Sequence, residues 1–317
     1  NMRLALAVFA AAIACLYIAS TPPTIYLGDS GEIVASAFSL GIGHPPGYPL
    51  YLMSAKAAMT FLPGDEAFRV NVFAAVLGAF VFVMMCLCVS ALVKAAFPGA
   101  RKGLAEASGL LTGLIYAMSP SFWAQAVQAK GGIYVMSHLI ILVSFFSLMR
   151  FISGRDRRFF YLLFYAAGFG AVAHTSAAFL TFAAAAAGIA VGLKRGVKFY
   201  GIAVAACFFL AGFITPYAYL FIRSAAPSAV LWNGTENVSG VLEHITRARY
   251  SGISAASAET VSYRLGNYVS EFVKNYNAAA LLAFLGLAAL YTRSRMAALF
   301  FAGAAAVTPC CCATNRS

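Results

Sequence analysis

Charged residues are scarce in this sequence. They make up 10% of its 317 residues, whereas a soluble domain carries about 25%. Hydrophobic residues account for 62%, which is more than a soluble core can bury. Long uncharged runs of about 18 or more apolar residues are typical of helices that cross a bilayer. The composition therefore excludes a soluble globular protein and predicts an all-α polytopic transmembrane helical bundle.

The uncharged runs predict about eight or nine spans. The clearest runs cover residues 4–20, 70–93, 133–149, 159–193, 199–222 and 278–290. The run from 159 to 193 is 35 residues long, too long for one crossing, and predicts two short helices with a turn at His174 and Thr175. The first run follows Arg3 as a signal peptide would, but no clear cleavage site precedes Pro22, so we expect a transmembrane helix.

Acidic residues are also few, and the basic ones are unevenly placed. With the N-terminus inside, the inner loops hold 13 of the 22 lysines and arginines, as the positive-inside rule requires. The net charge of +12 is thus a signal of topology, and we expect a lipid bilayer rather than nucleic acid as the partner. We expect an integral membrane protein with a cytoplasmic N-terminus.

Cysteines do not form a disulfide framework here. Four of the seven lie inside apolar runs, where they act as small hydrophobic side chains. The other three, Cys310 to Cys312, lie in a tail that follows the last apolar run. We expect one membrane domain at 1–308 and a truncated or non-native tail at 309–317.

Two long outer segments, at about 21–68 and 223–276, remain for polar chemistry. In the first, Asp29 and Glu32 have the spacing of a capping box before a short amphipathic helix. The prolines of HPPGYP at 44–49 end that helix, and a second apolar helix over about 49–61 follows. The two acids fit a purely structural cap. They also fit a catalytic role, because a carboxylate beside a bilayer is costly and a helix N-terminus keeps it ionised.

Three of the four histidines, His44, His174 and His244, fall on the same outer side, whereas His138 lies in a span. Each could be structural, but their convergence also favours a functional site. Their spacing matches no zinc motif, so we expect no bound metal or other cofactor, with a divalent ion left open. Sequence signatures of common hydrolases and of dinucleotide binding are absent.

The second outer segment combines basic and aromatic residues. The spacing of Glu243, His244, Arg247 and Tyr250 predicts that most of them share one helical face. An arginine there suits a phosphate, because its guanidinium can bind two oxygens. A solvated amphipathic helix on lipid headgroups fits the same pattern.

Two stretches in the first third of the chain, GDSGEIVASAFSLGIGHPPGYPLY at 28–51 and PGDEAFRVNVFAAVLGA at 63–79, carry a family resemblance. The chain resembles multi-pass bacterial membrane proteins related to eukaryotic protein O-mannosyltransferases, within the GT-C glycosyltransferase superfamily. AHTSAAFL at 173–180 and the stretch from WNG to LEHITRARY at 232–250 resemble later blocks, so the resemblance extends to about residue 292. It implies many spans, a long first outer loop and a polyprenyl-phosphate sugar donor.

The resemblance also implies roles for particular residues. It places Asp29 at the catalytic centre, with Glu32 and His44 at further motif positions. We expect transfer of a hexose, with mannose as the first candidate, to a protein or glycan hydroxyl at the periplasmic side, with inversion and with Asp29 as general base. The expected substrate-binding residues are His44, Tyr48, Arg69, Lys130, His174, His244, Arg247, Arg249 and Tyr250, among which Arg247 and Arg249 are the first candidates for the phosphate.

A transporter or flippase for a lipid-linked sugar or another anion is the alternative. It would place acids near the middle of the membrane and show inverted repeats, whereas the acids here cluster at the outer surface. A structural membrane scaffold is a third possibility. It does not explain why polar residues are concentrated in two outer segments.

Overall fold

The protein is built from helices, as a computed structural model shows. The model describes residues 2–99, 101, 103–154, 156–232, 234–248, 258–276 and 278–293. In these ranges the chain forms 13 helices. They are α1 (Met2–Ala19), α2 (Ser30–Ser39), α3 (Pro49–Met59), α4 (Glu66–Ala96), α5 (Leu104–Ala117), α6 (Pro120–Ala126), α7 (Ala129–Gly154), α8 (Arg157–Ala173), α9 (Thr175–Lys194), α10 (Phe199–Ser224), α11 (Val238–Thr246), α12 (Ala258–Tyr276) and α13 (Ala278–Arg293). The predicted all-α class is confirmed; the tail at 309–317 lies outside the described residues.

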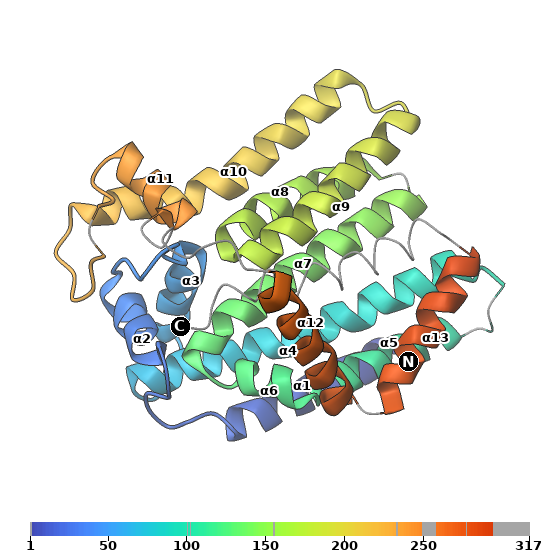
Figure 1. Cartoon of the computed structure of the whole chain (residues 1–317), viewed down its shortest axis with the longest axis horizontal. Helices are drawn as coiled ribbons and strands as arrows, with labels where there is room; N and C mark the ends of the chain where they lie inside the picture. Colours follow the sequence, from blue (N-terminus) through green and yellow to red (C-terminus); the bar gives the residue numbers. More distant parts are fainter. Residues whose placement is uncertain are drawn as a thin grey trace.

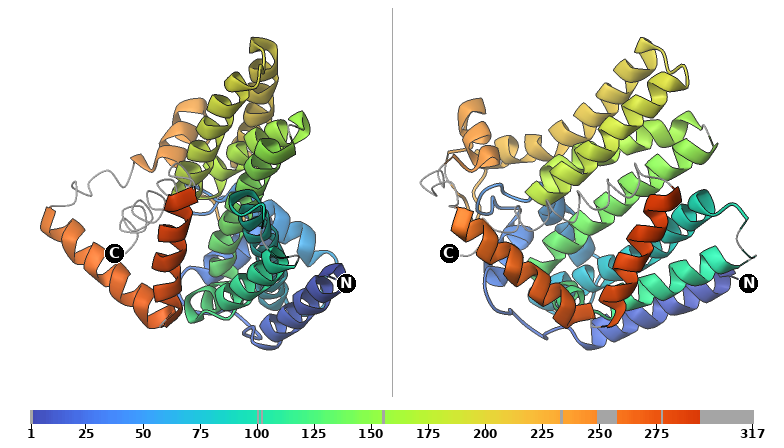
Figure 2. Two further views of the ribbon diagram at one scale, coloured as in Figure 1. Left: turned by 90° about the vertical axis from the view of Figure 1, so that its right-hand side faces the viewer. Right: turned by 45° about the vertical axis from the view of Figure 1, so that its right-hand side comes forward.

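The long helices lie side by side in one bundle (Figure 1). α4 packs against α1 and α5 and also against α7, α7 packs against α8 and α9, and α8 packs against α10. Figure 2 shows the same succession of helices from two other directions. The short helices α2, α3 and α11 gather at one end of this bundle. Asp29 and Glu32 lie at the start of α2, and His244 lies in α11.

Four helices, α4, α7, α9 and α10, are long and apolar enough to cross a membrane by length and composition. α1, α5 and residues 281–292 of α13 are apolar but shorter. The predicted division of the run 159–193 is confirmed, because α8 ends at Ala173 and α9 begins at Thr175. Residues 119–132, which connect α5 to the body of α7, contain α6 and the first turn of α7.

Helix α10 lies at one edge of the bundle and exposes large apolar side chains. Ile214 is 54% exposed, Phe221 is 50% exposed and Ile222 is 67% exposed. Contiguous apolar surface of this kind marks contact with lipid or with another protein. Together with the length of the helix, it supports integration into a membrane.

Helices α8 and α10 approach closely at two glycines. A Cβ atom on Gly168 would lie 2.3 Å from the carbonyl oxygen of Phe209, and one on Gly212 would lie 2.5 Å from that of Tyr165. Neither helix could therefore carry a larger residue at this contact without moving apart. Small residues at helix crossings provide close van der Waals packing where lipid removes most of the hydrophobic driving force.

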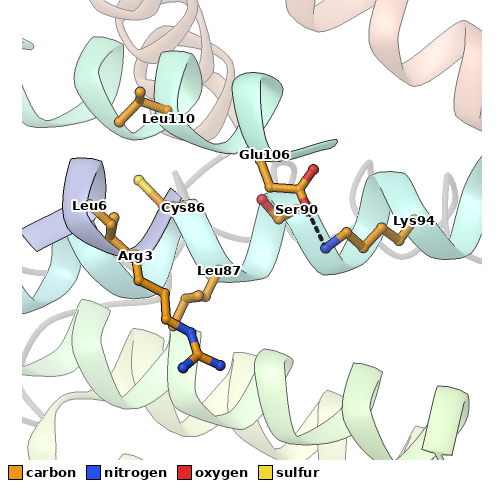
Figure 3. Close-up of a pocket in the computed structure, with 8 residues that line it drawn as sticks. All are labelled: Arg3, Leu6, Cys86, Leu87, Ser90, Lys94, Glu106 and Leu110. Atoms are coloured by element: carbon orange, nitrogen blue, oxygen red, sulfur yellow. Dashed lines mark ion pairs between the residues drawn. The ribbon is translucent and has the colours of Figure 1, made fainter. Parts of the chain in front are cut away.

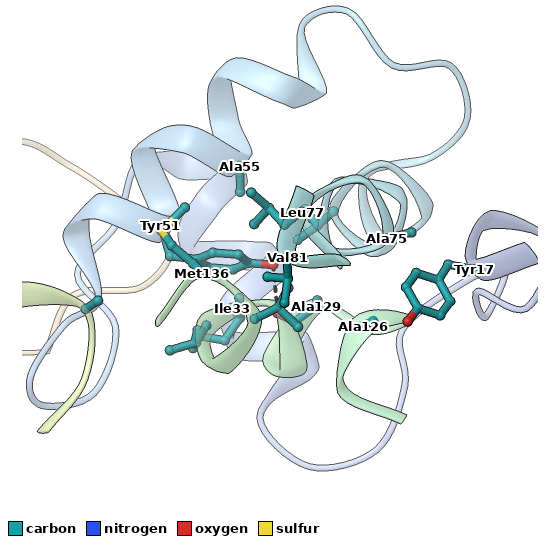
Figure 4. Packing of buried hydrophobic residues seen from close by; sticks show 14 of the residues in the cluster. Tyr17, Ile33, Tyr51, Ala55, Ala75, Leu77, Val81, Ala126, Ala129 and Met136 are labelled. Carbon is teal, nitrogen blue, oxygen red and sulfur yellow. Dashed lines mark hydrogen bonds between the residues drawn. The ribbon is translucent and has the colours of Figure 1, made fainter. Parts of the chain in front are cut away.

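The largest core joins the first surface helices to the bundle (Figure 4). Ile33 of α2 and Ala55 of α3 pack in one cluster with Leu77 and Val81 of α4 and Met136 of α7. The surface helices are thus fixed on the bundle by their apolar faces. This confirms the two short helices predicted for the first outer segment, and it gives the acids at the start of α2 a rigid support.

Asn71 of α4 joins three segments, and its replacement should destabilise the fold. It is 1% exposed; its Nδ2 donates to the carbonyl oxygens of Pro22 (2.9 Å) and Thr24 (3.2 Å), and its Oδ1 accepts from the backbone N–H of Ala129 (2.8 Å). Asn71→Leu leaves these backbone groups unsatisfied. We expect the free energy of unfolding in detergent micelles to fall by about 1–3 kcal/mol, since the N–H of Ala129 is buried and a buried unsatisfied group costs about that much.

Gln128→Leu is the matched control for this change. Within the described residues, the Gln128 amide donates to the carbonyl oxygen of Ala124, four positions earlier in the chain, and to no other group. Equal unfolding midpoints for the two variants would show that Asn71 does not hold the segments together.

Candidate active site

Asp29 lies immediately before α2 and forms an ion pair with α7. Its Oδ2 is 2.7 Å from Lys130 Nζ, and the two side chains are 43% and 35% exposed. The hydrogen bond from Lys130 lowers the pKa of Asp29, burial opposes this, and the charges of Lys130 and His44 lower it further, so that the pKa lies below its usual range. Asp29 is therefore an ionised, accessible carboxylate with a cation beside it.

The predicted capping box is wrong, although α2 begins at Ser30 as expected. Asp29 occupies the N-cap position without a side-chain capping hydrogen bond. Glu32 turns instead to the loop after α2. Its Oε1 accepts from the backbone N–H of His44 (2.7 Å), and its Oε2 lies 3.0 Å from His44 Nδ1. Both acids are thus engaged in contacts between segments rather than in capping.

Trp232, in the second outer segment, completes the contacts of Glu32. Its Nε1 donates to Glu32 Oε1 at 2.9 Å. The backbone beside it forms a parallel bridge in which Ile42 N–H donates to Val230 O (2.9 Å) and Trp232 N–H donates to Ile42 O (3.2 Å). Sequence reasoning did not select Trp232, although it lies in the WNG stretch that carries the resemblance and is one of only two tryptophans.

The C-terminal end of α2 is held by two basic side chains. Lys56 of α3 donates to the carbonyl oxygen of Phe38 at 2.6 Å. Arg223 of α10 donates to the carbonyl oxygens of Leu40 (2.7 Å) and Ser39 (3.1 Å). Cations at this end satisfy carbonyl groups that have no partner in the helix and complement the helix dipole. These contacts fix the helix whose other end presents the two acids.

His44 lies next to Glu32, and Tyr48 in turn contacts His44. The Tyr48 hydroxyl is 3.4 Å from His44 Nε2, and the two rings contact edge to face with centroids 5.3 Å apart. Burial raises the pKa of Tyr48 to about 12, with Arg247 opposing the shift. The hydroxyl therefore remains protonated at neutral pH.

Opposing effects set the pKa of Glu32. Burial raises the pKa of its carboxyl group, but the His44 ring, the His44 backbone N–H and the Trp232 indole together lower it below its usual range. Glu32 is consequently ionised, and every one of these contacts uses it as an acceptor.

His174 is the N-cap of α9 and is 4% exposed. Its Nδ1 accepts from the backbone N–H of Ser176 at 3.3 Å, whereas its Nε2 is buried and has no hydrogen-bond partner among the described residues. Burial is the main cause, with Arg247 and His138 next, of a pKa lowered to about 4. The ring is therefore neutral and carries its proton on Nε2, directed away from its own helix cap.

His244 and Arg247 do not share a helical face, which corrects the sequence prediction. α11 ends at Thr246, and Arg247 follows in the left-handed conformation with φ 56°. His244 is 4% exposed, and its Nε2 lies 3.1 Å from the carbonyl oxygen of Gly43. His244 thus fastens α11 to the first outer segment. The guanidinium of Arg247 has a buried Nη2 atom and acts electrostatically on both Tyr48 and His174.

The remaining predicted residues are not brought into the group of side chains around Asp29 and Glu32, here called the acidic cluster. Arg69 Nη1 donates to the carbonyl oxygen of Met59 at the end of α3, and within the described ranges it makes no hydrogen bond to either acid. Arg249 and Tyr250 lie outside the described residues. His138 contacts the Tyr116 hydroxyl at 3.1 Å within the bundle, in agreement with its predicted packing role. No group of three or more potential metal ligands occurs within the described part of the chain.

A separate hollow of about 390 Å³ lies toward the opposite end of α4 (Figure 3). Arg3 of α1, Cys86 and Lys94 of α4 and Glu106 of α5 are among its lining residues. Lys94 and Glu106 form an ion pair of 2.6 Å across its rim. The hollow is distinct from the acidic cluster, since it is formed by α1, α4 and α5 and includes none of the predicted site residues.

The chain is similar in sequence to known proteins. The chain is 30% identical over 141 residues to protein O-mannosyl-transferase TMEM260 of Mus musculus, covering 44% of this chain and 18% of the mouse protein. It is 23% identical over 134 residues to the protein O-mannosyl-transferase of Dictyostelium discoideum, covering 41% of this chain and 15% of that relative. These matches thus span less than a fifth of either relative. No solved structure matches significantly.

The profile of a protein family extends over more than half of the chain. The family is described as the protein O-mannosyl-transferase TMEM260 N-terminal domain, and the match covers residues 29–198. It includes seven predicted site residues, Asp29, Glu32, His44, Tyr48, Arg69, Lys130 and His174, while the stretch at 232–250 lies beyond it. The chain therefore belongs to the protein O-mannosyl-transferase TMEM260 N-terminal domain family.

Proposed function

We propose that this chain is a membrane glycosyltransferase of the GT-C type that uses a polyprenyl-phosphate hexose, with mannose as the first candidate. The acceptor is a hydroxyl group of a protein or glycan outside the membrane. The observation that carries the proposal is the acidic cluster at one end of the bundle, where Asp29 pairs with Lys130 and Glu32 binds Trp232. Membership of a mannosyltransferase family supports the same reaction.

The proposed reaction is a single inverting displacement. The acceptor oxygen forms a bond to the anomeric carbon as the bond from that carbon to the phosphate oxygen breaks, and the lipid phosphate leaves with the electron pair. Asp29 acts as general base and accepts the hydroxyl proton. The leaving phosphate carries negative charge, so a positioned cation stabilises it. Arg247 is the first candidate, because its charge acts on Tyr48 and His174; Arg249 and Tyr250 remain candidates from the sequence.

The proposed topology places the cluster where a lipid donor arrives by lateral diffusion. The charge distribution supports a cytoplasmic N-terminus and eight or nine spans through a bacterial inner membrane, with the cluster on the periplasmic side. The shorter apolar helices α1, α5, α8 and α13 supply the remaining crossings. Residues 1–308 form one domain in this proposal.

Purified protein incubated with radiolabelled polyprenyl-phosphate mannose tests the function. A transferase releases polyprenyl phosphate in proportion to acceptor glycosylated. A transporter or flippase instead moves intact donor across reconstituted vesicles, and this result would overturn the proposal. Polyprenyl-phosphate glucose and galactose, supplied in parallel, identify the sugar.

A further inference from the structure

The His44 ring has a defined protonation pattern. Glu32 is an ionised carboxylate, so it can only accept hydrogen bonds. Its Oε2 lies 3.0 Å from His44 Nδ1, and Nδ1 must therefore carry a proton. The neutral ring consequently has its lone pair on Nε2. The His44 side chain is 21% exposed, and the Tyr48 hydroxyl lies 3.4 Å from Nε2.

Glu32 is itself held in place from three directions. The His44 backbone N–H, the His44 ring and the Trp232 indole all donate to its two oxygens, at 2.7, 3.0 and 2.9 Å. A carboxylate fixed in this way orients the imidazole. The arrangement of carboxylate, Nδ1–H and basic Nε2 is the one by which hydrolases orient a histidine base.

Asp29 alone is a poor final acceptor for a proton. Its carboxylate is paired with Lys130, and the resulting low pKa weakens it as a base at neutral pH. His44 is close enough for its charge to lower the pKa of Asp29. No hydrogen bond joins the two side chains within the described residues, so the acceptor hydroxyl or a water molecule would bridge them.

We propose that His44 is a second proton acceptor of the transfer reaction and that Glu32 and Trp232 are its positioning residues. This proposal rests on the proposed function. The proton leaves the acceptor hydroxyl for the Asp29 carboxylate and then passes to His44 Nε2, which restores the ion pair between Asp29 and Lys130. The imidazolium so formed lies against the Glu32 carboxylate and returns its proton to solvent between turnovers.

Other charged and titratable groups surround the route of the proton from Asp29 to His44, here called the relay. They come from several elements, and a pH profile reports the whole set: Asp29 and Glu32 at the start of α2, Tyr48 at the start of α3, Lys130 on α7, and His244 and Arg247 at α11. Substitution of Glu32 separates His44 from the others, because Glu32 is the group in direct contact with its Nδ1.

The competing explanation is that His44 and Glu32 only fasten the loop after α2 to that helix. Kinetic measurements distinguish this structural role from the relay. We expect His44→Ala to lower kcat by at least about 100-fold with little change in KM, as the loss of general-base catalysis does. Added imidazole should restore part of the rate. Glu32→Gln removes the charge that favours the imidazolium, so the acidic limb of the kcat profile should move to lower pH. Trp232→Phe, which loses only the indole N–H, should move it in the same direction by less.

Matched controls are available elsewhere in the chain. Glu271→Gln alters an exposed acid of α12, and Trp123→Phe alters the other tryptophan; neither should move the acidic limb. An unchanged rate in His44→Ala, or an acidic limb that Glu32→Gln leaves in place, would overturn the relay. If His44→Ala fails to fold, the kcat profile of Glu32→Gln still tests the relay. An NMR titration of the His44 ring in the wild-type protein and in Glu32→Gln tests it independently.

The relay and the proposed function fail in different ways. Wild-type protein that releases no polyprenyl phosphate contradicts the function itself. Active wild-type protein whose rate is insensitive to His44 contradicts only the relay.

Discussion

Replacement of Asp29 by asparagine is expected to lower the rate of sugar transfer by about 100- to 10,000-fold, the usual contribution of general-base catalysis. Asparagine has nearly the same shape but cannot accept the proton. Asp29 makes no side-chain capping hydrogen bond to α2, so the helix should not lose a cap. The measurement is kcat for polyprenyl phosphate release, together with the thermal unfolding midpoint of each protein in detergent.

Two further variants test whether Asp29 itself is the general base. Asp156→Asn changes another aspartate, which caps α8 through the backbone N–H of Arg158 at 2.9 Å; asparagine caps as well as aspartate, so activity should be unchanged. Lys130→Met removes the ion pair but retains the carboxylate, and it should cost less than Asp29→Asn. If Lys130→Met and Asp29→Asn are equally slow, the ion pair itself is what matters and Asp29 is not the base.

Features set by local sequence could be predicted well. Apolar runs bounded by turn residues predicted the long helices, and the excess length of the run 159–193 predicted its division at His174. Asp29 directly precedes α2 as expected, and α2 ends at Ser39, before the prolines at 44–49. These features depend on neighbours within a few residues, whose preferences the sequence displays directly.

Features set by contacts between distant residues could not be predicted. The partner of Glu32 is Trp232, 200 positions away, and the partner of Asp29 is Lys130 on α7. The capping box failed because the donors of His44 and Trp232 compete for the same carboxylate. A spacing of three residues shows that a cap is possible, but it does not show which donors the folded chain brings to the acid.

The prediction for α11 failed for a related reason. Its helical period continues through Arg247 in the sequence, whereas the chain leaves the helix there in a left-handed turn. The buried contact of His244 with Gly43 fixes how α11 lies on the first outer segment. Arg247 thereby comes close enough to Tyr48 and His174 for its charge to lower the pKa of each, an effect that the helical wheel did not contain.

This placement leads to the second large effect. We expect Arg247→Met to raise KM for the polyprenyl-phosphate donor by about 10- to 100-fold, since hydrogen bonds to charged groups contribute about 1.5–3 kcal/mol. The effect should fall on KM more than on kcat, because the phosphate is charged in the bound donor as well as in the transition state. Arg247→Lys should recover part of the loss, as it keeps the charge without the planar pair of donors.

Arg158→Met is the control, since Arg158 is an exposed arginine at the start of α8. It should leave donor KM unchanged. If donor KM is unchanged in Arg247→Met but rises in Lys130→Met, the phosphate is held by α7 rather than by α11. In that case Lys130 must exchange Asp29 for the donor phosphate, and binding of the lipid would release the carboxylate from its ion pair. The pair of variants therefore decides whether the donor meets a preformed cation or creates the free base as it binds.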